Sequence, residues 1–167
     1  MPIDFTFPPE LDDLRLRVRD FIQGVVMLGE SRIGDPDEVD RGKYIQVLIE
    51  MRVQAREAGL WLPHMPEEWG GMGLSHTEMA MVQAEAAKSY YGSWVLNCQA
   101  PDEGNMHTLL HWATDEQKAK YLKPLCDGYA MSCFAMTEPE VAGSDPTLIR
   151  TTAIKDGEEW VINGHKW

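Results

Sequence analysis

The stretch YLKPLCDGYAMSCFAM, residues 121–136, contains the point at which the hydrophobic pattern of the chain changes. Before Gly128, apolar residues recur every three or four positions, as on one face of an amphipathic helix. Gly128 is suited to end that helix because glycine accepts the left-handed conformation. From Met131 the spacing shifts toward two, which is typical of strands. The stretch therefore predicts an α+β chain, with an all-α bundle over 1–130 and the start of an antiparallel β-domain over 131–167.

Upstream of this point the chain has helical periodicity throughout. Helical spacing of apolar residues predicts helices over 11–28, 44–55 and 105–112, and Gly59 is well placed to close the second of them in the left-handed conformation. Ser75 with Glu78, and Thr114 with Gln117, are capping-box patterns that mark two further helix starts. Residues 60–73 are too rich in glycine for a helix and too apolar for a free linker, so we expect a loop packed onto the bundle.

Downstream, short β-type segments alternate with turn signals. Residues 147–154 and 159–162 are expected to pair across Asp156-Gly157, and Asn163-Gly164 is a second hairpin signal. A strand ending at Thr137 is expected before them, and 165–167 should begin another strand. A sheet that stops there has unpaired edges and no covered face. The sequence is therefore expected to be a truncated piece of a larger protein.

Composition excludes several classes of protein. The chain has 167 residues, 44% of them apolar, with 15 basic and 27 acidic residues and a net charge of −12. That charge repels phosphate backbones, so we expect no nucleic-acid partner. No stretch approaches the roughly 20 apolar residues that span a bilayer, so we expect no membrane span. The first ten residues lack the pattern of a signal or transit peptide, which favours a cytoplasmic protein.

Cysteine and histidine patterns predict no metal site. Cys98, Cys126 and Cys133 lack metal-ligand spacing and are expected to be reduced and mostly buried. His107 and His111 are four residues apart on a predicted helix, a spacing that a metal could use. Because no HExxH motif or additional carboxylate accompanies them, we interpret both as core or surface histidines.

The segment with the most chemical content is FAMTEPEVAGSD, residues 134–145. It reads as a strand end, a proline-fixed turn, small residues whose amides can approach an anion, then a hydroxyl and a carboxylate. These residues alone leave two interpretations open, a phosphate or pyrophosphate site and a plain surface turn.

Together with Ile-Asn-Gly-His-Lys at 162–166, this segment resembles the signature region of the flavin-dependent acyl-CoA dehydrogenases. Residues 115–122 and the glycine-rich loop 69–73 are also similar to that family. The resemblance implies an oxidoreductase of fatty acid metabolism that is a flavoprotein with bound FAD. It also implies an acyl-CoA substrate, a flavoprotein-type electron acceptor, and assembly as a homodimer or homotetramer.

The resemblance also implies roles for particular residues. The backbone of Phe134, Ala135 and Met136 and the hydroxyl of Thr137 would lie against the polar edge of the flavin ring. Gly143 and Ser144 would meet the cofactor's pyrophosphate, and Ser144 would also approach the pantetheine arm of the substrate.

The sequence departs from the family pattern at one point. Three residues, 140–142, stand between Pro139 and Gly-Ser-Asp where the usual pattern has two, as in a subset of the family. The family's catalytic base and its flavin-stacking tryptophan would both follow Trp167, so no catalytic residue is expected in this chain. Glu138, Glu140 and Asp145 are interpreted as solvated turn carboxylates.

These observations favour part of an FAD-dependent acyl-CoA dehydrogenase, which introduces an α,β double bond into an acyl-CoA thioester. Two alternatives stay open at this point. One is an oxidase or monooxygenase of the same fold, whose reduced flavin reacts with oxygen. The other is a non-catalytic helical interaction module.

Overall fold

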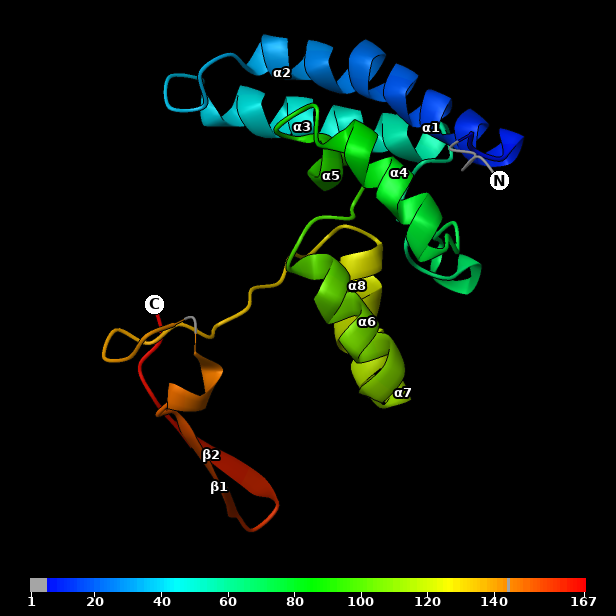
Figure 1. Ribbon diagram of the computed structural model, residues 1–167. Coiled ribbons are helices and arrows are strands. Elements are labelled where there is room, and N and C mark those ends of the chain that lie inside the picture. Colours follow the sequence, from blue (N-terminus) through cyan, green and yellow to red (C-terminus); the bar gives the residue numbers. More distant parts are fainter. Residues whose placement is uncertain (1–5, 144) are drawn as a thin grey trace. The chain divides into compact units, whose positions relative to one another are not determined.

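The computed structural model describes residues 6–143 and 145–167, and the chain divides into two compact units, 1–132 and 133–167. The first unit is helical and the second contains a two-stranded antiparallel sheet (Figure 1). The predicted α+β class is confirmed. Within the described part of the chain, no helix is both long enough and apolar enough to cross a membrane.

The first long helix consists of three consecutive segments: α1 (Pro9–Phe21), a π-helical turn (Ile22–Val26) and α2 (Met27–Ile33). The helix predicted over 11–28 therefore continues to Ile33 and ends at Gly34, whose φ is 71°. The π-helical turn has one residue more than an α-helical turn. Ile22 and Val26 are both fully buried, Val25 is half-buried against the core, and Gln23 and Gly24 are exposed. The turn thus keeps the apolar face of α1 and α2 on the core.

α3 (Arg41–Glu57) lies alongside this helix and packs against α2 (Figure 1). The side chain of Asp40 caps its start by accepting a hydrogen bond from the backbone N–H of Lys43. Gly59, with a φ of 64°, follows its end as predicted. Gly29 of α2 allows the close approach, because a Cβ there would lie 2.2 Å from the sulfur of Met51.

The helical unit also contains a 3₁₀ turn (Glu67–Trp69), α4 (His76–Ala86), α5 (Gly92–Val95), α6 (Asp102–Trp112), α7 (Asp115–Gln117), a π-helical turn (Lys118–Leu122) and α8 (Lys123–Cys126). Both predicted capping boxes, at Ser75 and Thr114, are confirmed. α6 begins at Asp102 rather than residue 105, because its first turn is polar and gave no hydrophobic signal. Gly128, with a φ of 72°, follows α8 as predicted.

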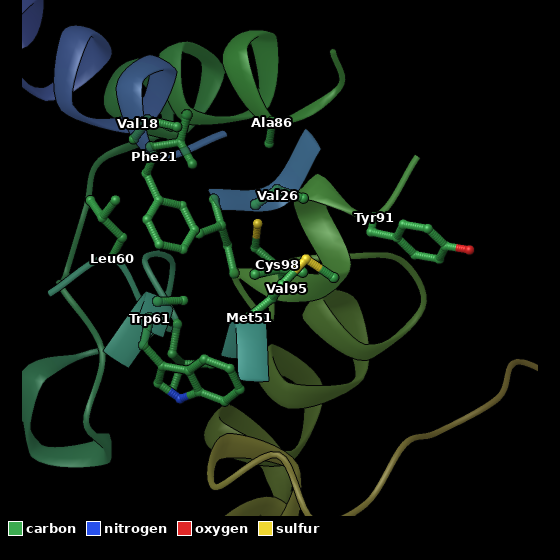
Figure 2. Packing of buried hydrophobic residues seen from close by; sticks show 14 of the residues in the cluster. Val18, Phe21, Val26, Met51, Leu60, Trp61, Ala86, Tyr91, Val95 and Cys98 are labelled. Atoms are coloured by element: carbon green, nitrogen blue, oxygen red, sulfur yellow. The ribbon is translucent and has the colours of Figure 1, made fainter. Parts of the chain in front are cut away.

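One hydrophobic core holds the helical unit together (Figure 2). Phe21 and Val26 from the first helix meet Met51 of α3 and Val95 of α5 there. The loop predicted to pack on the bundle does so, and Leu60, Trp61, Leu62 and Met65 are among its buried side chains. Cys98 and Cys126 are buried and Cys133 is exposed, and none of the three forms a disulfide in the described part of the chain.

The glycine-rich loop closes on its own backbone at Gly71. A Cβ at this position would lie 2.0 Å from the carbonyl oxygen of Met65 and 2.6 Å from that of Leu62. Backbone atoms cannot rotate away as a side chain can. Gly71→Ala is therefore expected to lower the free energy of unfolding by about 1–3 kcal/mol, measured by denaturant titration of the whole protein.

Gly104→Ala, in α6, is the matched control for Gly71→Ala. Apart from the chain neighbours and the backbone of α6 itself, no heavy atom of the described residues lies within 4 Å of a Cβ at position 104, and alanine is the better helix former by up to about 1 kcal/mol. Gly104→Ala should leave stability unchanged or raised. Equal stability of the two variants would contradict the close approach at Gly71.

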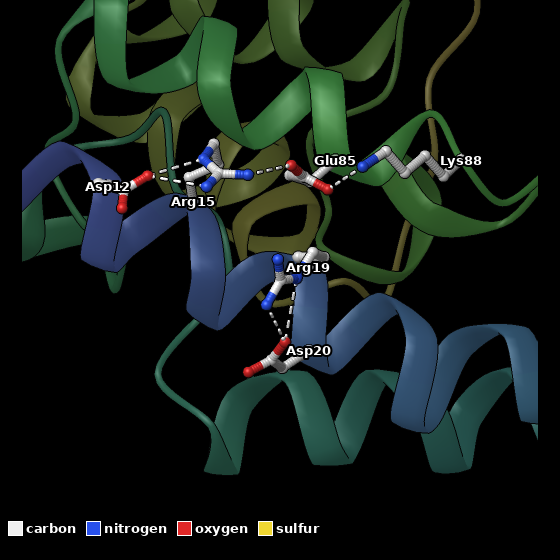
Figure 3. A network of polar contacts seen from close by, with 6 residues as sticks. All are labelled: Asp12, Arg15, Arg19, Asp20, Glu85 and Lys88. Carbon is white, nitrogen blue, oxygen red and sulfur yellow. Dashed lines mark hydrogen bonds and ion pairs between the residues drawn. The ribbon is translucent and has the colours of Figure 1, made fainter. Parts of the chain in front are cut away.

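A polar network joins α1 to α4 (Figure 3). Arg15 of α1 contacts Asp12 at 2.8 Å and Glu85 of α4 at 3.2 Å, and Lys88 also donates to Glu85. Glu85 is buried, which disfavours its charge, but the hydrogen bonds from Lys88 and Arg15 outweigh burial and lower its pKa. The buried carboxylate is thereby paired on both sides.

In the second unit, β1 (Thr152–Asp156) and β2 (Glu159–Asn163) form an antiparallel hairpin. The predicted pairing is confirmed, although the loop is Gly157–Glu158, one residue later than the Asp-Gly pair. Gly157 takes the first loop position with a φ of 61°. Every residue of both strands is exposed, so neither face of this hairpin is covered by the described residues.

The other strand predictions for this unit are wrong. Thr147 lies in a 3₁₀ turn, Pro146–Leu148, so the first strand begins only at Thr152. The described residues form no strand over 131–137 or 165–167, and Asn163-Gly164 ends β2 instead of making a hairpin. A strand needs a hydrogen-bonded neighbour along its length. Among the described residues, the backbones of these two segments share one hydrogen bond, from the N–H of Trp167 to the carbonyl oxygen of Thr137 at 3.3 Å.

Candidate functional site

Glu138 is the most firmly held side chain of the 134–145 segment. Its side chain is buried, with 3% exposure for the residue. One carboxylate oxygen accepts from the N–H of Arg150 at 2.7 Å, and the other accepts from the N–H and hydroxyl of Thr151 at 2.9 and 2.6 Å. The interpretation of Glu138 as a solvated turn carboxylate is therefore wrong, because the chain at 150–151 returns over it.

Lys166 joins the two signature motifs. Its Nζ donates to Glu138 at 3.0 Å and to the carbonyl oxygen of Met136 at 2.9 Å. The next residue, Trp167, donates its N–H to Thr137. The Thr-Glu-Pro segment and the Ile-Asn-Gly-His-Lys segment thus lie side by side, held by a largely buried ion pair.

These contacts fix the charge of Glu138. The hydroxyl of Thr151, the N–H of Arg150 and the ammonium of Lys166 lower the pKa of Glu138 to about 2. A carboxylate that is ionised at neutral pH and whose oxygens already accept these bonds is a poor proton acceptor. Its chemistry suits a positioning role.

The other two carboxylates of the segment lie at the surface as expected. Asp145 accepts hydrogen bonds from the hydroxyl and N–H of Thr147, which lower its pKa and cap the 3₁₀ turn. Glu140 is exposed and lies 3.3 Å from a ring nitrogen of His165.

The residues predicted to hold a cofactor are accessible. Phe134, Ala135 and Thr137 are exposed and Met136 is half-buried. Gly143 lies against Thr137, since a Cβ at 143 would be 3.2 Å from the methyl group of Thr137 and 3.5 Å from its hydroxyl oxygen. The structure therefore brings Thr137 and Gly143 together. Ser144 lies outside the described residues.

Sequence reasoning missed Thr151 and assigned no role to Lys166. Gly164 is the related signal, because a Cβ there would lie 2.0 Å from the hydroxyl oxygen of Thr151. Only glycine leaves room for that hydroxyl to reach Glu138. The glycine and the lysine of Ile-Asn-Gly-His-Lys thus serve the same carboxylate.

The helical unit has an open groove of about 1040 Å³ along α3, α5 and residues 127–131. Exposed apolar side chains of α3, among them Ile49 and Val53, line it. At its edge the guanidinium of Arg52 lies 4.7 and 4.2 Å from the ring centres of Trp61 and Trp94. Burial lowers the pKa of Arg52 to about 10, so this side chain stays cationic at neutral pH.

A second cluster of titratable side chains lies in the helical unit at His64, Glu103 and His107. Nδ1 of His64 and Nε2 of His107 are 3.1 Å apart. Burial, and secondarily the neighbouring His107, lower the pKa of His64 to about 4. The sequence pattern had grouped His107 with His111, but those two rings stack with centres 6.3 Å apart while His107 meets His64.

Both units match domain models of one protein family. The model of the acyl-CoA dehydrogenase N-terminal domain matches residues 8–129, and that of the acyl-CoA dehydrogenase middle domain matches residues 133–167. The solved structure of a Mycobacterium abscessus protein assigned as an acyl-CoA dehydrogenase is 35% identical, with a TM-score of 0.80. That match covers 98% of this chain and 42% of the other.

Two curated relatives agree with this assignment. "Acyl-CoA dehydrogenase family member 11" of Gallus gallus is 37% identical over 93% of this chain, and FadE2 of Mycobacterium tuberculosis, assigned as an acyl-CoA dehydrogenase, is 35% identical over 99%. The chain spans 20% of the length of the first relative and 41% of the second. It carries the N-terminal domain and part of the middle domain, and it belongs to the acyl-CoA dehydrogenase family.

Proposed function

We propose that this chain is the N-terminal part of an FAD-dependent enzyme that introduces an α,β double bond into an acyl-CoA thioester. The observation that carries the proposal is the contact of Glu138 with Lys166, which ties the two family motifs into one structure. In this arrangement Thr137 is held from both sides, by the anchored Glu138 and by Trp167.

The exposed segment fits the polar edge of a flavin. Residues 134–137 present accessible backbone and one hydroxyl, and the neighbouring Gly143 has no side chain to prevent the approach of a pyrophosphate. Bound FAD would supply the acceptor for the β-hydrogen that leaves the substrate as hydride. Hydrogen-bond donors from Thr137 and its neighbours would stabilise the negative charge that develops beside them. The carboxylate that removes the α-proton is proposed to lie outside this chain.

Further properties stay predictions. A chain from an electron-transferring flavoprotein structure of Acidaminococcus fermentans is 25% identical, with a TM-score of 0.58, and this supports a flavoprotein as electron acceptor. A homodimer or homotetramer, and a cytoplasmic location, are expected on the grounds given for the sequence.

Absorbance spectroscopy of the whole protein tests the proposal. We expect it to purify with near-stoichiometric FAD, and a saturated acyl-CoA added without oxygen should bleach the flavin. Residues 1–167 expressed alone should retain flavin weakly. Oxygen consumption that exceeds the reduction of an artificial dye would indicate an oxidase or monooxygenase, and absence of flavin would contradict the proposal.

A further inference from the structure

Three side chains with metal-ligand chemistry converge between the packed loop and α6. Glu103 and His107 are four residues apart on α6, so both project from the same face of this helix. His64 comes from the loop over 60–66. One ligand atom from each of the three lies within 4.8 Å of the others.

The hydrogen bonds of His64 decide which of its nitrogens has a free lone pair. Its Nε2 lies 3.3 Å from the carbonyl oxygen of Asn97. A carbonyl oxygen only accepts, so Nε2 carries the proton, and Nδ1 of the neutral ring bears a lone pair. That nitrogen is the one that faces His107. A backbone carbonyl that orients the far side of a ligating imidazole is a usual feature of metal sites.

The spacing of the two nitrogens suits a shared ion. Two nitrogens that each lie about 2.0–2.1 Å from a tetrahedral ion are about 3.3–3.4 Å apart. The observed 3.1 Å between the His64 and His107 nitrogens differs from this by a few tenths of an ångström. A small movement of the half-buried His107 side chain covers the difference.

Of the three side chains, His64 is held in place by its surroundings, while the other two are accessible from solvent. His64 is buried, and the loop that carries it is fixed by bonds from the N–H of Leu62 to Leu96 at 2.9 Å and from the N–H of Leu74 to Pro63 at 3.1 Å. Glu103 and His107 are only half-buried, so an ion could enter from solvent and keep a water as its fourth ligand.

We propose that His64, Glu103 and His107 bind one divalent transition-metal ion, with Zn²⁺ as the best match to two imidazoles and a carboxylate. The ion would join the packed loop to α6, two segments of the helical unit that are distant in sequence. It would therefore stabilise the folded helical unit by an amount that grows with the logarithm of the ion concentration relative to its Kd.

Titration of the chelator-treated whole protein with Zn²⁺, against a chromogenic chelator, tests the site. We expect one equivalent to bind to this site and the thermal midpoint to rise. His107→Gln and Glu103→Gln should each weaken binding at least tenfold. His111→Gln is the matched control, because it changes a histidine on the same helix outside the cluster and should keep the wild-type affinity. Co²⁺ should give the visible absorption of a tetrahedral site, lost in His107→Gln.

The variants avoid the buried His64, and their thermal midpoints without metal confirm that they are folded. If His107→Gln or Glu103→Gln binds Zn²⁺ as tightly as the wild type, the ion is held elsewhere and the proposal is wrong. It is equally wrong if the wild type binds no Zn²⁺, or if His111→Gln loses as much affinity as His107→Gln. In those cases the two histidines form only a hydrogen bond.

Discussion

Glu138→Gln is expected to weaken FAD binding by the whole protein roughly tenfold or more while the helical unit stays folded. Glutamine keeps the size of the side chain but removes the charge that pairs with Lys166, and charge-assisted hydrogen bonds are about twice as strong as neutral ones. Its amide also places a donor against one of the N–H groups of Arg150 and Thr151. The segment that presents Thr137 would then lose its anchor.

Glu140→Gln provides a matched control two residues away. Glu140 is exposed, and its contact with His165 is of the kind that contributes little to stability. For both variants, absorbance gives the amount of FAD bound per protein, and titration of the apoprotein with FAD gives the affinity. If Glu138→Gln retains FAD as well as Glu140→Gln does, the buried ion pair has no part in holding the site.

The same carboxylate predicts a pH dependence. The folded protein holds the pKa of Glu138 at about 2, below its ordinary value of 4.5. A depressed pKa means that the stabilisation is present above about pH 4.5 and is lost as the pH falls toward 2. In the wild type, the protonation of Glu138 should contribute to the release of FAD at low pH. In Glu138→Gln, which has no carboxylate at this position, this part of the pH dependence should be absent.

Thr137→Val is expected to slow reduction of the flavin by the substrate. The change removes one hydroxyl donor at nearly constant volume, and a hydrogen bond to a charged group contributes about 1.5–3 kcal/mol. If the full amount acts in the transition state, the rate should fall about 10- to 150-fold. Anaerobic stopped-flow absorbance with a saturated acyl-CoA measures this rate.

Thr152→Val makes the same substitution at an exposed position of β1 and serves as the control. Valine favours strands, so this variant should fold and reduce its flavin at the wild-type rate. A Thr137→Val enzyme that is reduced as fast as the control would show that Thr137 does not contact the ring.

Local signals in the sequence were sufficient to predict most helices of the helical unit. The capping boxes and the glycines at 59 and 128 act within a few residues, so their pattern alone locates helix ends. α5 was not predicted, since four residues are too few to show a period. Whether an extended segment becomes a strand depends on a neighbouring strand that can be far away in the sequence. The segment ending at Thr137 has no strand beside it among the described residues, so it forms none.

The burial of Glu138 could not be predicted from its sequence neighbours, because its partners are also distant in the sequence. A carboxylate next to a proline in a turn resembles any solvated acid. Its partners Arg150, Thr151 and Lys166 follow it by 12, 13 and 28 residues, and only the folded chain brings them together. The likeness of the motifs to a family predicts where the cofactor site lies, but it gave no sign of the contacts that hold this segment in place.

The π-helical turn in the first helix gives the chain a place where its length can change. Removal of Gly24 would convert five residues of π-helix into a regular α-helical turn and leave Ile22 three positions from Val26 instead of four. Both spacings put the two side chains on one face of an α-helix. A single-residue deletion here would leave α2 facing the core, so an alignment gap at this point would report no change of fold.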